Sequence, residues 1–72
     1  MTTENLLASR LIANHGSRRV FIADLNSYEQ ELFDRVIEQA PSDVAGDWVC
    51  EGAINLHCSQ GSVQIYGSAV CP

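Results

Sequence analysis

The fold of this chain is decided by the stretch "VCEGAINLHCSQGSVQIYGSAVC", Val49 to Cys71, which holds all three cysteines and a single charged residue, Glu51. One parity of this stretch is strongly apolar and the other is mostly polar. The apolar alternation starts one residue earlier, at Trp48, continues through Cys50, Ile54, Leu56 and Cys58, and resumes as Val63, Ile65, Ala69 and Cys71. A period of two held over this length predicts two strands, each with one buried face.

The dipeptide Gln60-Gly61 separates the two runs and predicts a tight hairpin with a two-residue loop. Such a loop sets a register in which Ile54 faces Gly67 and Cys50 faces Cys71. The two cysteines would then occupy a non-hydrogen-bonded pair with Cα atoms about 4.5 Å apart, near the lower end of disulfide geometry. Two states stay open, a Cys50–Cys71 disulfide and the free thiols that a reducing cytoplasm favours.

The first segment of the chain predicts an amphipathic helix of about three turns. Leu7 and Leu11 recur at helical spacing, and Thr2 or Thr3 can cap the start. Gly16 stands where a left-handed C-terminal cap belongs. A short β-rich run, "RRVFIAD" from Arg18 to Asp24, follows and predicts a strand.

A second helix is predicted for "NSYEQELFDRVIEQAP", residues 26–41. Ser27 with Gln30 fits a capping box, and Asn26 with Glu29 offers an alternative frame. Two apolar rows follow at helical spacing, Tyr28, Leu32, Val36 and Ala40 in one and Phe33 and Ile37 in the other. Pro41 marks the end of this helix.

These segments predict a single α+β domain spanning residues 1–72, in the order α-β-α-β-β. We expect a three-stranded antiparallel sheet with two helices packed on one face. The last strand carries no charge, which suits a central position, because edge strands usually carry the charged residues.

Charge is distributed unevenly along the 72 residues, whose net charge is −5. Residues 24–51 carry eight acidic side chains and only one basic side chain, Arg35. Direct nucleic-acid binding is therefore disfavoured, because it needs a basic face that displaces counterions. The longest apolar run is four residues, too short to span a bilayer, and the amino terminus lacks a secretory pattern. The expected location is the cytoplasm.

No residues point to a metal site, a cofactor or catalysis. Structural zinc is normally held by closely spaced cysteine pairs, whereas the cysteines here are separated by seven and twelve residues. His57 alternates to the face opposite Cys58, so the two side chains cannot share an ion or form a thiol–imidazole pair. The sequence thus predicts a protein that is not an enzyme.

The acidic side of the second helix is the candidate binding surface. Glu31, Asp34 and Glu38 recur at i, i+3 and i+7, on the side opposite the apolar rows. The same sign extends to the margin through Glu29, Asp43 and Asp47. Two interpretations stay open, a solvated face that keeps the protein soluble and a surface that binds a partner with a basic groove.

In its short length, acidic charge and lack of an enzyme motif, the chain resembles the small phage-encoded inhibitors, above all the anti-CRISPR proteins. Several of those proteins mimic the charge of nucleic acid and occupy a DNA-binding surface of the CRISPR complex. The resemblance implies a large protein or ribonucleoprotein partner and action in the host cytoplasm. It carries no residue over to this chain.

An alternative of another class is a small regulatory or accessory subunit, similar to an antitoxin, that binds its partner through an apolar patch. Salt dependence separates the two functions. Binding through charge weakens as salt rises, whereas binding through an apolar patch does not.

Overall fold

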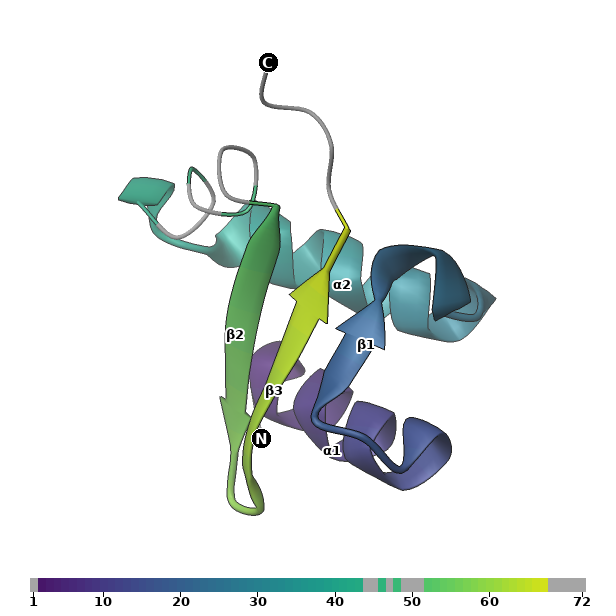
Figure 1. Cartoon of the computed structure of the whole chain (residues 1–72). Coiled ribbons are helices and arrows are strands. Elements are labelled where there is room, and N and C mark those ends of the chain that lie inside the picture. The colour runs from purple at the N-terminus through teal and green to yellow at the C-terminus, as the bar shows by residue number, and fades with distance from the viewer. Residues whose placement is uncertain (1, 44–45, 47, 49–51, 68–72) are drawn as a thin grey trace.

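A computed structural model describes residues 2–43, 46, 48 and 52–67 of the chain. Its architecture is α+β, as predicted (Figure 1). The main elements, in chain order, are α1 (Thr3–His15), β1 (Arg19–Phe21), the 3-10 turn η1 (Ile22–Asp24), α2 (Ser27–Gln39), β2 (Ala53–Cys58) and β3 (Gly61–Tyr66).

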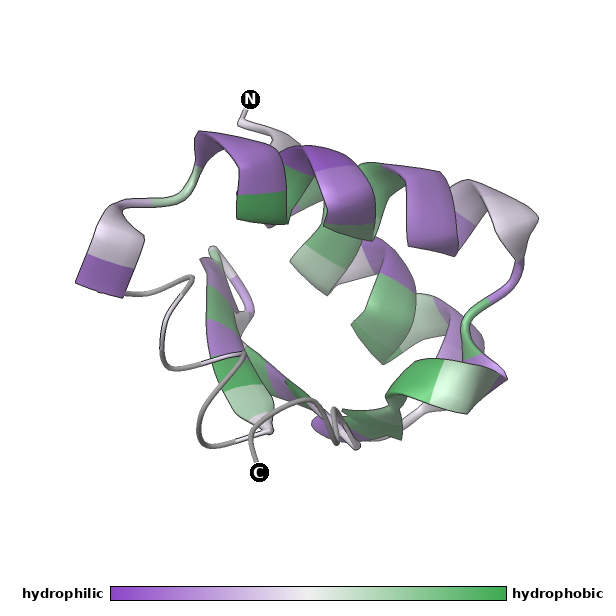
Figure 2. Ribbon diagram, turned by 90° about the horizontal axis from the view of Figure 1, so that it is seen from above, coloured by the Kyte–Doolittle hydropathy of each residue, from purple (hydrophilic) through white to green (hydrophobic). Residues whose placement is uncertain are grey.

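β3 lies at the centre of the three-stranded sheet, between β1 and β2. Figure 1 shows α1 and α2 behind one face of this sheet, and the view from above in Figure 2 places both on the same side. The predicted central position of the uncharged last strand and the packing of both helices on one face are therefore confirmed. No described helix covers the opposite face of the sheet.

β1 runs parallel to β3, with Val20 beside Ile65, so the sheet is mixed and the expectation of a purely antiparallel sheet is wrong. The cause is the path of α2. A helix running back along the sheet would return the chain to the end where β1 starts and make the next strand parallel to β1. Instead α2 crosses the sheet near the end where β1 stops, and β2 starts from that end (Figure 1).

The hairpin register is shifted by two residues from the predicted one. Cys58 pairs with Gly61, so Ser59 and Gln60 form the loop, and Ile54 pairs with Ile65. A shift of two keeps every side chain on its face, and the alternation cannot detect it.

Arg18 stabilises the observed loop. Its guanidinium donates hydrogen bonds to the carbonyl oxygens of Gln60 at 2.8 Å and Ser62 at 3.2 Å. It lies against Gly61, where a Cβ would stand 2.7 Å from Nη1; the backbone φ of +117° is the reason that this position favours glycine.

The expectation that Cys50 faces Cys71 rested on the register that the structure replaces. Both cysteines lie outside the described residues. Cys58, the remaining cysteine, is half-buried and its thiol is free.

α1 has the predicted ends. The Thr2 hydroxyl accepts a hydrogen bond from the Asn5 N–H, and Gly16 adopts the left-handed conformation with φ of 63°. Leu7, Ala8 and Leu11 are buried along one side of the helix.

α2 begins with the second of the two predicted capping boxes. Asn26, not Ser27, is the N-cap, and a reciprocal capping box joins it to Glu29. The helix ends at Gln39, and Ala40 is extended because the residue before a proline is disfavoured in the helical region.

The core lies between the sheet and the two helices. Its buried apolar side chains are Leu7, Ala8 and Leu11 of α1, Val20 of β1, Leu32, Phe33 and Val36 of α2, Ile54 and Leu56 of β2, and Val63 and Ile65 of β3. The Trp48 ring packs edge-on against Phe33, with a centroid distance of 4.9 Å.

β1 is shorter than predicted. It pairs with β3 only from Arg19 to Phe21, opposite Gln64 to Tyr66. Since β3 ends at Tyr66, the chain after Phe21 has no strand to pair with and turns into η1.

Gly67, directly after β3, cannot be replaced without strain. Its φ is +107°, and a Cβ there would collide with the Phe21 ring and stand 3.2 Å from Ile22 Cγ2. We expect Gly67→Ala to lower the free energy of unfolding by about 2–3 kcal/mol, from backbone strain and the displaced ring. Urea unfolding followed by circular dichroism measures the loss.

Gly16→Ala is the matched control, because Gly16 also has a positive φ, of +63°, but has open space around it. Its expected loss is about 1 kcal/mol, the backbone term alone. Equal losses for the two variants would contradict the contact between Gly67 and Phe21.

Candidate functional site

The predicted acidic residues of α2 fall into an exposed group and a buried one. Glu31, Asp34 and Glu38 are exposed, as is Asp43 beyond the helix. Asp47 lies outside the described residues. We call Glu31, Asp34 and Glu38 together the acidic face.

The packing of α2 turns the acidic face away from the sheet. Leu32, Phe33 and Val36 point into the core, and residues three or four apart from one another share a side of a helix. Figure 2 shows hydrophilic residues along the outer side of α2. The acids therefore stand together on one solvent-facing side.

Glu29 does not belong to this surface, although the sequence placed it at the margin. Its side chain is only 1% exposed. As the third residue of the helix it folds back on the N-cap, where Glu29 Oε1 accepts a hydrogen bond from the Asn26 N–H at 3.0 Å. The capping box thus turns the carboxylate inward and removes it from any partner's reach.

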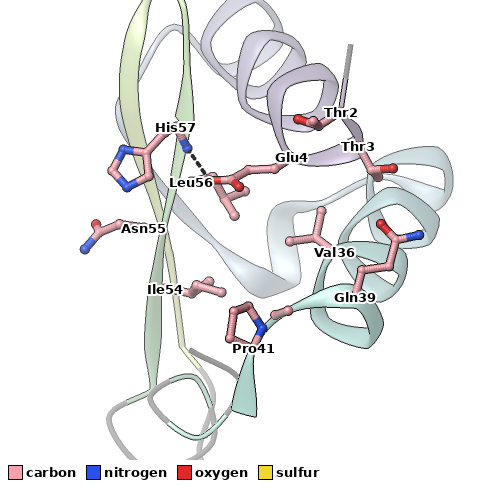
Figure 3. A pocket seen from close by; sticks show the side chains of 11 residues that line it. Thr2, Thr3, Glu4, Val36, Gln39, Pro41, Ile54, Asn55, Leu56 and His57 are labelled. Atoms are coloured by element: carbon pink, nitrogen blue, oxygen red, sulfur yellow. Dashed lines mark hydrogen bonds between the residues drawn. The ribbon is translucent and has the colours of Figure 1, made fainter. Parts of the chain in front are cut away.

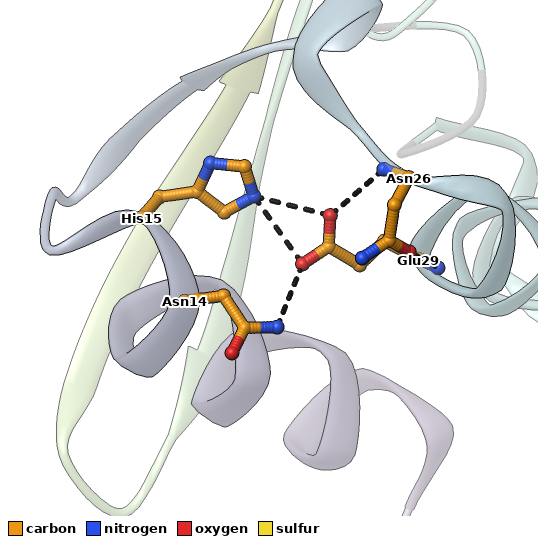
Figure 4. Close-up of polar contacts among 4 residues, drawn as sticks. All are labelled: Asn14, His15, Asn26 and Glu29. Atoms are coloured by element: carbon orange, nitrogen blue, oxygen red, sulfur yellow. Dashed lines mark hydrogen bonds and ion pairs between the residues drawn. The ribbon is translucent and has the colours of Figure 1, made fainter.

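The C-terminal end of α1 completes the environment of Glu29 (Figure 4). The Asn14 amide donates to Glu29 Oε2 at 3.0 Å. His15 Nε2 lies 3.1 Å from Oε1 and 3.2 Å from Oε2. One carboxylate therefore joins the start of α2 to the end of α1.

These contacts outweigh the cost of burial. Burial raises the pKa of the Glu29 carboxyl, but hydrogen bonds from Asn26, Asn14 and His15, with the charge of His15, lower that pKa by more. The net result is a pKa below the ordinary value of 4.5. Glu29 is thus a structural anion.

Three of the four arginines are held by neutral groups. Arg10 stacks over the Tyr28 ring at 4.6 Å, and Arg19 over the Tyr66 ring at 4.9 Å. Arg18 is bound to the carbonyl oxygens of the hairpin loop. Within residues 2–43, 46, 48 and 52–67, no arginine forms an ion pair with a carboxylate. Arg35, the fourth arginine, is exposed on the same side of α2 as the acidic face, so the three acids and this one arginine leave a net negative charge there.

The uncovered face of the sheet carries a second cluster, in which side chains of β1 contact side chains of β3. Phe21 is 39% exposed and packs against Tyr66, with ring centroids 5.4 Å apart. Arg19 stacks on Tyr66 and donates to the Gln64 side-chain oxygen at 3.3 Å. Period-two alternation in β1 and β3 places these side chains on one face. The sequence signal for this cluster is the alternation in β1, where Arg19 and Phe21 are exposed on either side of the buried Val20.

In the part of the chain that the structure describes, no group of three or more His, Cys, Asp or Glu side chains is placed to hold a metal ion. Among the same residues, no helix has the length and hydropathy needed to cross a membrane.

Comparison of the chain with protein-family models, with curated proteins and with solved structures yields no match. The function of the protein has therefore to be inferred from the geometry of its described residues.

Proposed function

We propose that the protein is a non-enzymatic inhibitor that binds the basic nucleic-acid-binding surface of a larger protein or ribonucleoprotein complex through its acidic face. The observation that carries this proposal is the exposure of Glu31, Asp34 and Glu38 without an arginine partner among the described residues. Among the described residues these carboxylates form no ion pair, and Asp34 accepts a hydrogen bond only from the neutral Gln30 amide, so they can meet the basic side chains of another protein.

The mechanism is competition for charge. Neighbouring acids on a helix stand about 5–6 Å apart, close to the interval between phosphates along a strand. Arginines and lysines that hold nucleic acid could bind these carboxylates instead, which would exclude the nucleic acid. A target of this kind, such as a CRISPR complex or nuclease, implies action in the cytoplasm.

The test is reversal of charge across the acidic face. We expect the triple variant Glu31→Lys, Asp34→Lys, Glu38→Lys to fold, because all three side chains are exposed. It should lose affinity for the target by about 100-fold or more, since each reversal turns an attraction into a repulsion. The measurement is capture of nuclease-treated nucleic-acid-binding complexes on immobilised protein, followed by release with duplex DNA as the competitor.

Single reversals supply the control. Asp34→Lys and Asp24→Lys change the net charge equally, and both side chains are exposed, but Asp24 lies in η1, off the acidic face. Asp34→Lys should weaken capture much more than Asp24→Lys. Capture that withstands the triple reversal, or that duplex DNA does not release, would show that the acidic face only keeps the protein soluble.

A second candidate function rests on the exposed Phe21 and its contact with Tyr66. Here the protein would be an accessory subunit that docks through the uncovered sheet face. Binding would then withstand high salt and the triple reversal, and Phe21→Ser would weaken it.

A further inference from the structure

A groove runs along the edge of β2 that faces away from β3, where no other described strand pairs with it (Figure 3). It is a cavity of about 420 Å³ between β2, the start of α1 and the end of α2. This volume is within the range of about 300–1,000 Å³ that is usual for ligand pockets. β2 forms the strand side of the groove, and the helices supply the opposite side.

Backbone groups of β2 point toward this edge. Gly67 N–H donates to the Gly52 carbonyl at 2.9 Å, and Gln64 N–H donates to Arg18 on the β1 side at 2.8 Å. In an antiparallel pair, bonded and non-bonded residue pairs alternate. The bonded pair of Gly52 with Gly67 therefore makes the pair of Asn55 with Gln64 a non-bonded one. Consequently the N–H and C=O of Asn55 face away from β3.

Glu4 already forms a hydrogen bond with one backbone group of this edge. The same alternation turns the His57 N–H outward, and it donates to Glu4 Oε2 at 2.8 Å. The carboxylate thus occupies the place that a carbonyl of an added strand would take. Figure 3 shows this bond, with the His57 ring turned away from the groove. Asn55 makes no such bond within the described residues.

The lining sets the chemistry of an occupant. Apolar residues form much of it, namely Val36, Ala40, Pro41, Ile54 and Leu56. Glu4 is the only Asp, Glu, Lys or Arg among the residues that line the cavity. The groove therefore complements an extended chain that carries apolar side chains on one parity and a basic side chain at the Glu4 end.

We propose that the β2 edge binds an extended, basic segment of a partner protein by strand addition. The segment pairs with the backbone of Asn55, seats apolar side chains against Ile54 and Val36, and places a lysine or arginine beside Glu4. Strand addition of this kind takes its affinity from main-chain hydrogen bonds and its selectivity from the pockets for alternate side chains. This contact is separate from the acidic face.

A phage-displayed library of random linear peptides is the probe. We expect the enriched peptides to combine β-branched residues at alternate positions with a lysine or arginine. A synthetic peptide from the enriched set, titrated into isotope-labelled protein, should shift the amide resonances of residues 53–57 and slow exchange of the Asn55 N–H. Absence of enrichment, or shifts confined to the outer side of α2, would overturn the proposal.

Two substitutions at Asn55 separate the backbone from the side chain. Asn55→Pro removes the outward N–H, and proline is tolerated at such a position of an edge strand; we expect at least about a tenfold loss of affinity. Asn55→Ala keeps the N–H and should bind as the wild type does. Should Asn55→Pro not fold, an N-methylated peptide tests the same bond on wild-type protein. Undiminished binding by that peptide refutes strand addition.

Glu4→Gln tests the charge. Glutamine can still accept from His57 N–H but carries no charge. Affinity should fall about fivefold for the lysine-containing peptide and stay constant for the same peptide with norleucine in place of lysine. An equal effect on both peptides would contradict the proposed role of Glu4.

Discussion

Ile65→Ala is expected to lower the free energy of unfolding by about 4 kcal/mol, near the upper end of the range for truncation of a buried isoleucine. Ile65 is fully buried in the central strand, between Val20 of β1 and Ile54 of β2. Because strands flank it on both sides, the surrounding chain has little freedom to collapse into the space left by the removed atoms. Urea unfolding measures the loss.

The loss would be a large share of the total stability. A chain of 72 residues has an expected free energy of unfolding of roughly 4–11 kcal/mol. Gln64→Ala is the control, one residue earlier in the same strand and on the uncovered face; it gives up only the contact with Arg19 and should lose less than about 1 kcal/mol. Similar losses for the two variants would contradict the assignment of the buried face of β3.

The sequence predicts the faces of the elements well, because periodicity determines them. Leu7 and Leu11 of α1, Leu32 and Val36 of α2, and Ile65 of β3 all point inward as their spacing indicates. The uncovered face, by contrast, carries contacts between strands that the sequence did not predict. Its cluster joins Arg19 and Phe21 to Tyr66, and the two strands that carry it are brought together only by the fold.

Register and strand direction could not be predicted for two different reasons. A shift of two residues leaves all faces unchanged, whereas the hydrogen bonds of Arg18 to the hairpin loop join residues more than 40 positions apart, which the local alternation does not contain. The direction of β1 depends on how α2 crosses the sheet. That crossing depends on long-range packing of α2 against α1, which leaves no local pattern in either segment.

Glu29 shows how one capping choice alters a functional prediction. With Ser27 as the N-cap, Glu29 would be an ordinary first-turn acid and part of the charged surface. With Asn26 as the N-cap, it becomes the third residue of the helix and turns inward. Serine and asparagine are both favoured as N-cap residues, so N-cap propensity does not tell whether Ser27 or Asn26 begins the helix. The difference removes one carboxylate from the candidate surface.

Glu29→Ala is accordingly expected to lower the free energy of unfolding by about 3 kcal/mol, since hydrogen bonds to a buried charged group are the strong ones. The substitution leaves Asn26, Asn14 and His15 without the acceptor that they share. Glu31→Ala, two residues further along the same helix and exposed, should change stability by less than about 0.5 kcal/mol. Thermal and urea unfolding of both variants provide the measurement.

The dependence of the free energy of unfolding on pH tests whether the charge of Glu29 causes this stabilisation. Because its pKa in the folded protein lies below the ordinary 4.5, the folded state favours the ionised form. The stability that this charge contributes is therefore complete above the pKa of the unfolded chain and is lost as the pH falls through the lower, folded pKa. Glu29→Gln lacks this titration, so its stability should fall less steeply in acid than that of the wild type, and the two curves should converge at low pH. Parallel curves would mean that Glu29 acts through its shape alone, and would remove the reason for treating it as a structural anion that joins the two helices.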